Sequence, residues 1–248
     1  MVARPGRARS RGAGARHAQN VGMYAERVLT RLPGVAWELT SSAPYRVLPD
    51  GCTDLIWMGG RLMVAGPDTR ATVTGPTEAR ITGVRFAPGT GPSVFGVAAH
   101  ELRDVRVPLV DLWPGPEVRE LEERLLAGAD PAALLEDAAS RHAAARGGGD
   151  DPSTRWVAGE LDRGTAVAEI ARRLGITERH LYRRSVIAFG YGAKTLQRIL
   201  RLQHALTLAR RGTPAAIAAL DAGYADQTHL AHDVRALTGV SLGGLLGP

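Results

Sequence analysis

Residues 166–190, AVAEIARRLGITERHLYRRSVIAFG, decide the fold of the C-terminal part of the chain. Apolar residues recur there at the spacing of one helical face, and the pattern stops at Gly175. Thr177 is a suitable N-cap for a second helix, whose outward positions are mainly basic. A helix, a turn with glycine and a second helix with a basic outer face predict a helix-turn-helix unit.

Residues 213–239, TPAAIAALDAGYADQTHLAHDVRALTG, repeat this pattern. Thr213 is expected to cap the first helix, and Asp226 is expected to cap the second. The buried face of the first helix is predicted to consist of Ile217, Ala218 and Leu220. The sequence therefore predicts a second helix-turn-helix unit.

The segment Lys194–Arg211 between the two units has helical periodicity throughout. Its roughly 18 residues give a helix of about 27 Å. Adjacent major-groove segments on one face of B-DNA lie about 34 Å apart. One long helix is thus expected to join two units that reach neighbouring segments of the same DNA.

The rest of the chain has a different pattern of apolar and turn-forming residues. Residues 23–113 are short apolar runs broken by Gly, Pro and Asp, which predict a β-rich sandwich or barrel of six to eight strands. Two of these runs flank Gly59-Gly60 and predict a hairpin. The other predicted segments are a disordered Arg-rich tail (1–22), an acidic helical segment (114–146), a linker (147–152) and the helical C-terminal domain (153–248). The expected fold class is α+β, with a β-rich domain followed by an all-α domain.

Composition and charge restrict the function classes. The chain has 248 residues, 44% of them hydrophobic, and a formal net charge of +6. Residues 155–248 carry +6 by themselves, the sign expected of a domain that meets a polyanion, although a solvated basic surface would look the same. No apolar run approaches the roughly 18 residues of a membrane span, and no signal-peptide pattern is present, so a cytoplasmic protein is expected. A single cysteine, Cys52, excludes a disulfide framework and a multi-cysteine zinc site.

At this point the sequence resembles a known family. The stretches IARRLGITERHLYRR, FGYGAKTLQRILRLQ and AALDAGYADQTHLAHDVRALTG resemble the DNA-binding domain of AraC-family transcription regulators, over residues 153–246. PDGCTDLIWMGG and ELRDVRVPLVDLW resemble the N-terminal domain of a set of actinobacterial regulators. Three departures stand out: Ser185 and Val234 replace aromatic residues that pack the second helix of each unit, and Leu242 replaces a proline.

The resemblance implies a sequence-specific regulator that reads two adjacent major-groove segments of promoter or operator DNA. Arginine pairs with guanine, glutamine pairs with adenine, and threonine or tyrosine contacts the thymine methyl group. The positions implied to read bases are Arg179, Tyr182, Arg183, Gln227, Thr228 and His232. The candidates for phosphate contacts are Arg184, Lys194, Arg198 and Arg211.

The N-terminal domain is expected to sense a small-molecule effector or to form a homodimer, and RNA polymerase is a further candidate partner. Cys52, Asp54 and Trp57 are the candidate effector-binding residues. A purely structural interpretation is also open, in which Cys52 is a small buried residue after a tight Asp-Gly turn. No cofactor, metal ion, membrane or catalytic residue is expected.

The alternative is a Cys52-dependent enzyme, or an alkyl-transfer protein with an appended DNA-binding module. Alkyl-transfer proteins of this kind hold the reactive cysteine in a four-cysteine zinc site, whereas this chain has one cysteine. A thiol enzyme would need a histidine to activate Cys52, and His100 is the only one in the β-rich block. A regulator, not an enzyme, is therefore the favoured hypothesis.

Overall fold

The computed structural model describes residues 18–19, 23–147 and 151–246. Most of the tail predicted as disordered, residues 1–22, and part of the predicted linker, residues 148–150, lie outside these ranges. Two residues of that tail form strand β1 (Ala18–Gln19), which pairs with β4 (Tyr45–Val47). The prediction of a tail without structure is therefore wrong at these two positions.

The N-terminal domain is built on a six-stranded antiparallel sheet with the order β2-β3-β8-β5-β6-β9. Its strands are β2 (Met23–Val28), β3 (Gly34–Ser41), β8 (Thr77–Phe86), β5 (Thr53–Met58), β6 (Arg61–Ala65) and β9 (Arg106–Pro108). A smaller sheet has the order β1-β4-β7, with β7 at Thr72–Thr74. Residues 23–113 thus contain eight strands, β2 to β9, within the six to eight expected there, and β1 adds a ninth among the described residues.

The predicted β5–β6 hairpin is confirmed. Gly59 and Gly60 both have positive φ, +58° and +77°, as a two-residue type I′ turn requires. Because side chains alternate along a strand, Leu55 and Trp57 face one side of the sheet while Asp54 faces the other. The two faces have different neighbours.

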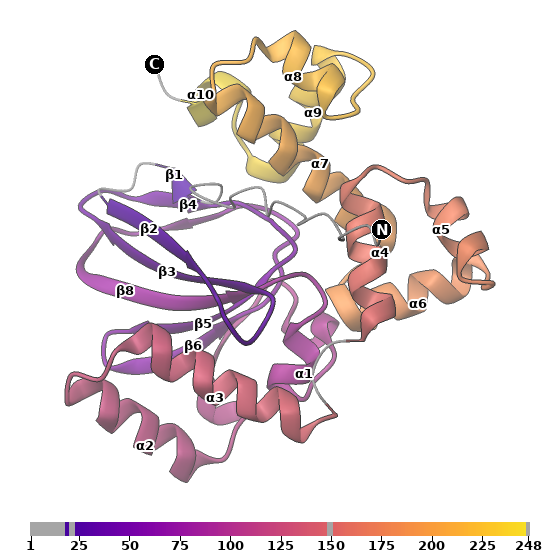
Figure 1. Cartoon of the computed structure of the whole chain (residues 1–248). Coiled ribbons are helices and arrows are strands. Elements are labelled where there is room, and N and C mark those ends of the chain that lie inside the picture. Colours follow the sequence, from indigo (N-terminus) through magenta and orange to yellow (C-terminus); the bar gives the residue numbers. More distant parts are fainter. Residues whose placement is uncertain (1–17, 20–22, 148–150, 247–248) are drawn as a thin grey trace, which may run out of the picture.

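Helices cover the face that carries Leu55. They are α1 (Gly91–Phe95), η1 (Ala99–Leu102), η2 (Leu109–Asp111), α2 (Gly115–Leu126) and α3 (Pro131–Ala145). Figure 1 shows α2 and α3 side by side beneath the sheet. Leu121 and Leu135 share one hydrophobic core with Leu55 and Phe86, so the acidic helices pack on the sheet.

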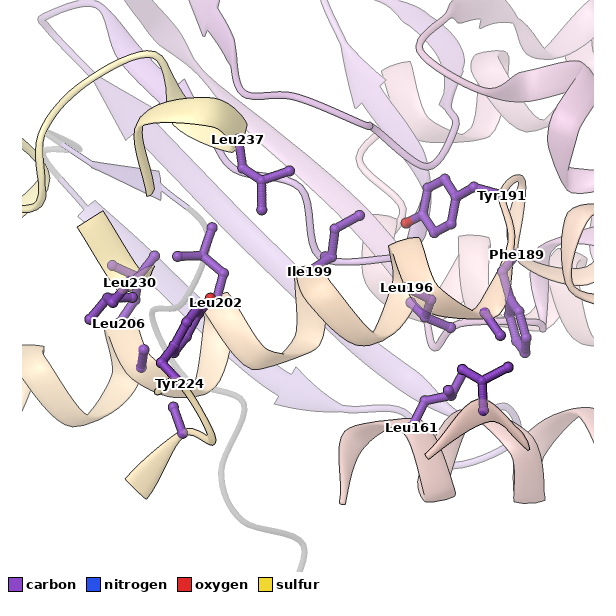
Figure 2. Packing of buried hydrophobic residues seen from close by; sticks show 14 of the residues in the cluster. Leu161, Phe189, Tyr191, Leu196, Ile199, Leu202, Leu206, Tyr224, Leu230 and Leu237 are labelled. Carbon is purple, nitrogen blue, oxygen red and sulfur yellow. The ribbon is translucent and has the colours of Figure 1, made fainter. Parts of the chain in front are cut away.

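The C-terminal domain is entirely helical in its described residues, as expected. Its helices are α4 (Pro152–Asp162), α5 (Val167–Arg173), α6 (Glu178–Phe189), α7 (Ala193–Arg210), α8 (Ala215–Asp221), α9 (Gln227–Thr238) and α10 (Leu242–Leu246). Helix α7 is the central element: Leu196 packs near Phe189 at one end, and Leu206 packs near Leu230 at the other (Figure 2). The predicted long connecting helix is thus confirmed.

The two domains have separate cores and touch along one interface. Leu48, from the N-terminal domain, is only 1% exposed because it belongs to the hydrophobic cluster of the C-terminal domain. The side chain of Gln203 on α7 donates a hydrogen bond to the Pro49 carbonyl at 2.7 Å. Among the residues with described positions, no helix is long and apolar enough to cross a membrane.

Candidate nucleic-acid interface

The first helix-turn-helix unit consists of α5 and α6. Gly175 adopts φ +66° in the turn, and Thr177 Oγ1 accepts a hydrogen bond from the His180 backbone N–H at 3.2 Å, which confirms the predicted N-cap. Helix α6 ends at Gly190, whose φ of +85° is the left-handed conformation common at helix C-termini. Local sequence signals therefore define both ends of α6.

The second unit consists of α8 and α9. Asp226 Oδ1 accepts a hydrogen bond from the His229 backbone N–H at 2.7 Å, so this predicted N-cap is also confirmed. Thr213 does not cap α8: the N-cap residue is Pro214, and no side chain caps that end. The helix begins one residue later than the sequence suggested.

The predicted buried face of α8 is wrong at two of its three positions. Ile217 is 50% exposed and Leu220 is 61% exposed, whereas Ala218 and Ala219 are fully buried. Small side chains let α8 lie close to α7, so the packed face is an alanine face. The size of an apolar side chain was a misleading guide to burial here.

All six predicted base-reading residues lie on exposed surfaces of the second helices, α6 and α9, which we call the recognition helices. Exposed on α6 are Arg179, Tyr182 and Arg183, and exposed on α9 are Gln227, Thr228 and His232. The Tyr182 ring lies against Gly192, where an added Cβ would come within 2.6 Å of it. A shallow depression in this surface is lined by Thr177, Arg179, His180, Arg183, Arg184 and Ile187.

The arginines of the C-terminal domain fall into two groups. Outside the recognition helices, several form ion pairs within the chain: Arg163 with Glu160, Arg172 and Arg173 with Glu169, and Arg201 with Asp233. The pairing with Arg172 and Arg173 lowers the pKa of Glu169 to about 2. By contrast, Arg179 and Arg183 form no ion pair with any described residue. Helix α6 therefore presents uncompensated positive charge.

Two of the four candidate phosphate contacts have intramolecular partners. Arg184 pairs with Asp151 at 3.2 Å and donates to Ser153 Oγ at 2.5 Å. Arg198 Nε donates to Asp233 Oδ1 at 2.8 Å. Lys194 and Arg211 are exposed, have no ion pair among the described residues, and remain candidates.

Asp233 is a residue that the sequence reasoning missed. It is 6% exposed on α9 and receives both Arg198 and Arg201 of α7, and Arg201 also lies 4.3 Å from the centre of the Tyr224 ring. These contacts fix α9 to α7. The available signal was an acidic residue within the apolar series Leu230, Val234 and Leu237.

The two departures from the family pattern occupy equivalent positions in the recognition helices. Ser185 is 1% exposed, and its Oγ has no hydrogen-bond partner among the described residues. Val234 is fully buried in the hydrophobic cluster of α7. The structure thus accommodates small side chains at both positions, but only Val234 suits its apolar surroundings.

In the N-terminal domain, the three candidate effector residues do not form one site. The Asp54 carboxylate accepts hydrogen bonds from Trp37 Nε1 at 2.6 Å and Arg85 Nε at 3.1 Å. Trp57 lies on the opposite face of β5, where it packs against the core beneath the sheet. The grouping of Asp54 with Trp57 is therefore wrong, and Trp37 is the tryptophan beside Asp54.

Cys52 lies in the turn before β5. Its backbone N–H donates to Asp50 Oδ1 at 2.8 Å, and burial together with the nearby Asp50 raises the pKa of its thiol well above the ordinary value. A raised pKa disfavours the thiolate that nucleophilic chemistry needs. His100 lies exposed on η1, with no hydrogen bond to Cys52.

Arg85 is the centre of a buried polar cluster that the sequence reasoning also missed. It is 7% exposed and lies 3.3 Å from Asp50, 3.1 Å from Asp54 and 4.0 Å from Glu26. Arg85 Nη1 and Glu26 Oε2 have no hydrogen-bond partner among the described residues. An arginine placed directly between the apolar residues Val84 and Phe86 was the available signal.

Comparisons with known protein families match the N-terminal and the C-terminal domain separately. Residues 170–246 match a family described as a helix-turn-helix domain, and residues 28–108 match a domain family of unknown function, DUF6597. No curated protein matches the chain.

Several solved structures of ToxT from Vibrio cholerae are similar over most of their length. ToxT from strain O395 is 11% identical with a TM-score of 0.43, covering 94% of this chain and 98% of that one. ToxT bound to (E)-4-(8-methylnaphthalen-1-yl)but-3-enoic acid is 11% identical with a TM-score of 0.44, covering 93% and 97%. With the matched family and the two units above, the C-terminal part of this chain is an AraC-type helix-turn-helix domain, the DNA-binding module of transcription regulators.

Proposed function

We propose that the protein is a sequence-specific transcription regulator that places α6 and α9 in two adjacent major-groove segments of operator DNA. The first helix supplies Arg179, Tyr182 and Arg183, and the second supplies Gln227, Thr228 and His232. Arginine on α6 suits guanine, and glutamine on α9 suits adenine. The two units are thus expected to prefer different bases.

One observation carries this proposal. The arginines Arg163, Arg172, Arg173 and Arg201 are neutralised by carboxylates of the same chain, whereas Arg179 and Arg183 on α6 have no such partner among the described residues. An arginine whose charge is already compensated contributes little to binding a polyanion. Two free arginines therefore lie on the helix that a helix-turn-helix inserts into the groove, and Lys194, Arg211 and Arg235 add exposed positive charge elsewhere in the domain.

Selection of bound sequences from a random DNA pool, with the full chain at a fixed salt concentration, tests the proposal. We expect a motif of two elements whose centres lie about 10 base pairs apart. A doubled motif would add support for the predicted homodimer. Binding that is salt-sensitive and indifferent to sequence would contradict the proposal, because phosphate contacts alone would then account for it.

Control by an effector is the finer part of the proposal, and the contacts of Asp50 support it. Asp50 pairs with Arg85 in the buried cluster, and the adjacent Pro49 carbonyl accepts the hydrogen bond from Gln203 of α7. A molecule that displaces Asp50 from Arg85 would act next to Pro49, whose carbonyl is hydrogen-bonded to α7, the helix that joins the two units. Asp50→Asn imitates that displacement, and we expect it to change the affinity for the selected DNA. An unchanged affinity would count against effector control by this route.

The alternative hypothesis, a Cys52-dependent enzyme, predicts a different effect of substitutions. A cysteine-dependent enzyme would lose its function in Cys52→Ala with DNA binding intact. We expect Cys52→Ala to leave DNA binding and regulation unchanged, whereas Arg183→Ala weakens both. Recruitment of RNA polymerase remains a prediction of the sequence.

A further inference from the structure

The N-terminal domain contacts the C-terminal end of both recognition helices. On α6, the carbonyl of Gly190 accepts a hydrogen bond from Arg103 Nη1 at 3.2 Å. On α9, the carbonyl of Leu237 accepts from the Ala71 backbone N–H at 2.7 Å, and the carbonyl of Thr238 accepts from Arg46 Nη1 at 3.0 Å. One domain therefore holds two helices that belong to different units.

These contacts suit the chemistry of helix ends. The last carbonyls of a helix lack partners within the helix, and the C-terminus carries partial negative charge. Arg46 and Arg103 each bring a donor with positive charge to such a carbonyl, so both attachments are charge-assisted. The sequence of the C-terminal domain alone gives no sign of them.

A third attachment reaches α7 between the two units. The loop Leu48–Cys52 buries Leu48 in the C-terminal cluster and accepts a hydrogen bond from Gln203. Gly51 has φ +82°, and an added Cβ there would come within 2.6 Å of Leu196 Cδ1. The loop therefore fits closely against the middle of the C-terminal domain.

Direct attachment between the recognition helices is missing, by contrast. No hydrogen bond or ion pair among the described residues joins α6 to α9. Each is linked to the other through α7 and, by the contacts above, through the N-terminal domain. A single helix can bend along its length, and a second support limits that bending.

We propose that the N-terminal domain braces α6 and α9 and so sets the spacing at which the chain reads its two DNA elements. This inference rests on the proposed function. When the recognition helices are already held at one distance, binding to DNA with that spacing does not require them to lose conformational freedom. DNA with another spacing binds only if the held arrangement changes, which lowers the affinity. The braced chain therefore discriminates between DNA spacers, and an unbraced chain tolerates several.

The glycines that end the recognition helices offer a matched pair of variants. Gly190 has φ +85°, and a Cβ there would come within 2.7 Å of Pro67 Cγ and 3.2 Å of the Ala99 carbonyl oxygen, both in the N-terminal domain. Gly239 has φ +77°, and a Cβ there meets nothing within 4 Å. Both alanine variants strain a left-handed helix end, but only Gly190→Ala pushes the domains apart.

The experiment measures the affinity of the full chain for the selected two-element DNA, with the spacer lengthened or shortened by one and two base pairs. We expect the wild type and Gly239→Ala to prefer one spacer by at least about fivefold, the lower range of coupling between linked sites. We expect Gly190→Ala to flatten this profile. The double variant Arg46→Ala/Arg103→Ala should flatten the spacer profile as well, without adding any atom to the interface. Its control for lost charge is Arg80→Ala, because Arg80 is an exposed arginine on β8.

The outcomes separate the two proposals. A wild type that binds its selected DNA specifically, with the same spacer profile in Gly190→Ala and in the double arginine variant, overturns the brace and leaves the proposed function standing. A wild type without sequence-specific binding overturns both. A flattened profile in both variants, with folding confirmed by thermal unfolding, supports the brace.

Discussion

The two helix-turn-helix units share one architecture but differ in their charge. The outward face of α6 carries the unpaired Arg179 and Arg183, whereas α9 carries Gln227, Thr228 and His232. The acidic residue within α9, Asp233, is buried and paired with arginines of α7. Among the described residues, the first unit thus has two free arginines at its predicted base-reading positions, whereas the second has polar side chains there and one free arginine, Arg235, elsewhere on α9. Two helix-turn-helix units of the same architecture can therefore contribute differently to DNA binding.

Removing Asp233 should break the second unit with the largest effect. In Asp233→Ala, Arg198 and Arg201 lose their shared carboxylate and α9 loses its attachment to α7. Because both arginines are partly exposed, we expect a loss of about 3 kcal/mol in the free energy of unfolding, at the lower end for buried pairs. Urea unfolding followed by circular dichroism measures it. Glu169→Ala removes a partly exposed acid that also pairs with two arginines, and it serves as the control with a smaller expected effect.

Substitutions on the recognition surfaces should separate charge from base reading. We expect Arg183→Ala to cost about 2 kcal/mol in specific DNA binding and to reduce the dependence of affinity on salt. His232→Ala should lower specific affinity while the salt dependence stays the same. Fluorescence anisotropy across a salt series measures both. Equal salt slopes in the two variants would contradict the division of tasks, and Arg172→Ala is the control for an arginine already paired with Glu169.

The equivalent positions 185 and 234 give a smaller test. Ser185 Oγ is buried without a partner among the described residues, so Ser185→Ala should raise the free energy of unfolding by about 1 kcal/mol. The reverse exchange, Val234→Ser, places a hydroxyl in an apolar cluster and should lower it. Chemical denaturation of the two variants decides. Destabilisation by Ser185→Ala would mean that its hydroxyl is bonded after all.

The smallest effect concerns the contact of α4 with the first unit. Hydrogen bonds from Ser153, with Arg184 nearby, hold the pKa of Asp151 below its ordinary value. The stabilisation is therefore present above the unfolded pKa and is lost as pH falls through the lower folded pKa. Since the side chain is half exposed, Asp151→Asn should cost less than about 0.5 kcal/mol at neutral pH and reduce the pH dependence of unfolding in acid. A larger pH dependence in the variant would contradict this assignment.

The elements of the C-terminal domain could be predicted because their signals are local. The N-caps Thr177 and Asp226 and the periodicity of α7 are properties of neighbouring residues, and all three are confirmed. The contacts between elements could not be predicted in the same way. The exposure of Ile217 depends on how closely α8 lies to α7, and the partner of Arg198 depends on a residue 35 positions away.

The same reason explains the failures in the N-terminal domain. Asp54 and Trp57 are three residues apart, so strand alternation places them on opposite faces, whereas Trp37 reaches Asp54 from a different strand. The docking of Leu48, Arg46 and Arg103 onto the C-terminal domain likewise joins residues that are far apart in the sequence. Long-range pairing of this kind leaves no periodic pattern.

The most direct test of two-unit reading is base-modification interference on DNA bound by the full chain. Methylation of guanine N7 blocks the atom that arginine contacts in the major groove, and replacing adenine by 7-deazaadenine removes the N7 that glutamine contacts. We expect a guanine patch and an adenine patch on one face of the DNA, about 10 base pairs apart, with Arg183→Ala reducing interference only in the guanine patch and Gln227→Ala only in the adenine patch. Interference confined to one patch, or binding that is insensitive to both modifications, would contradict the account.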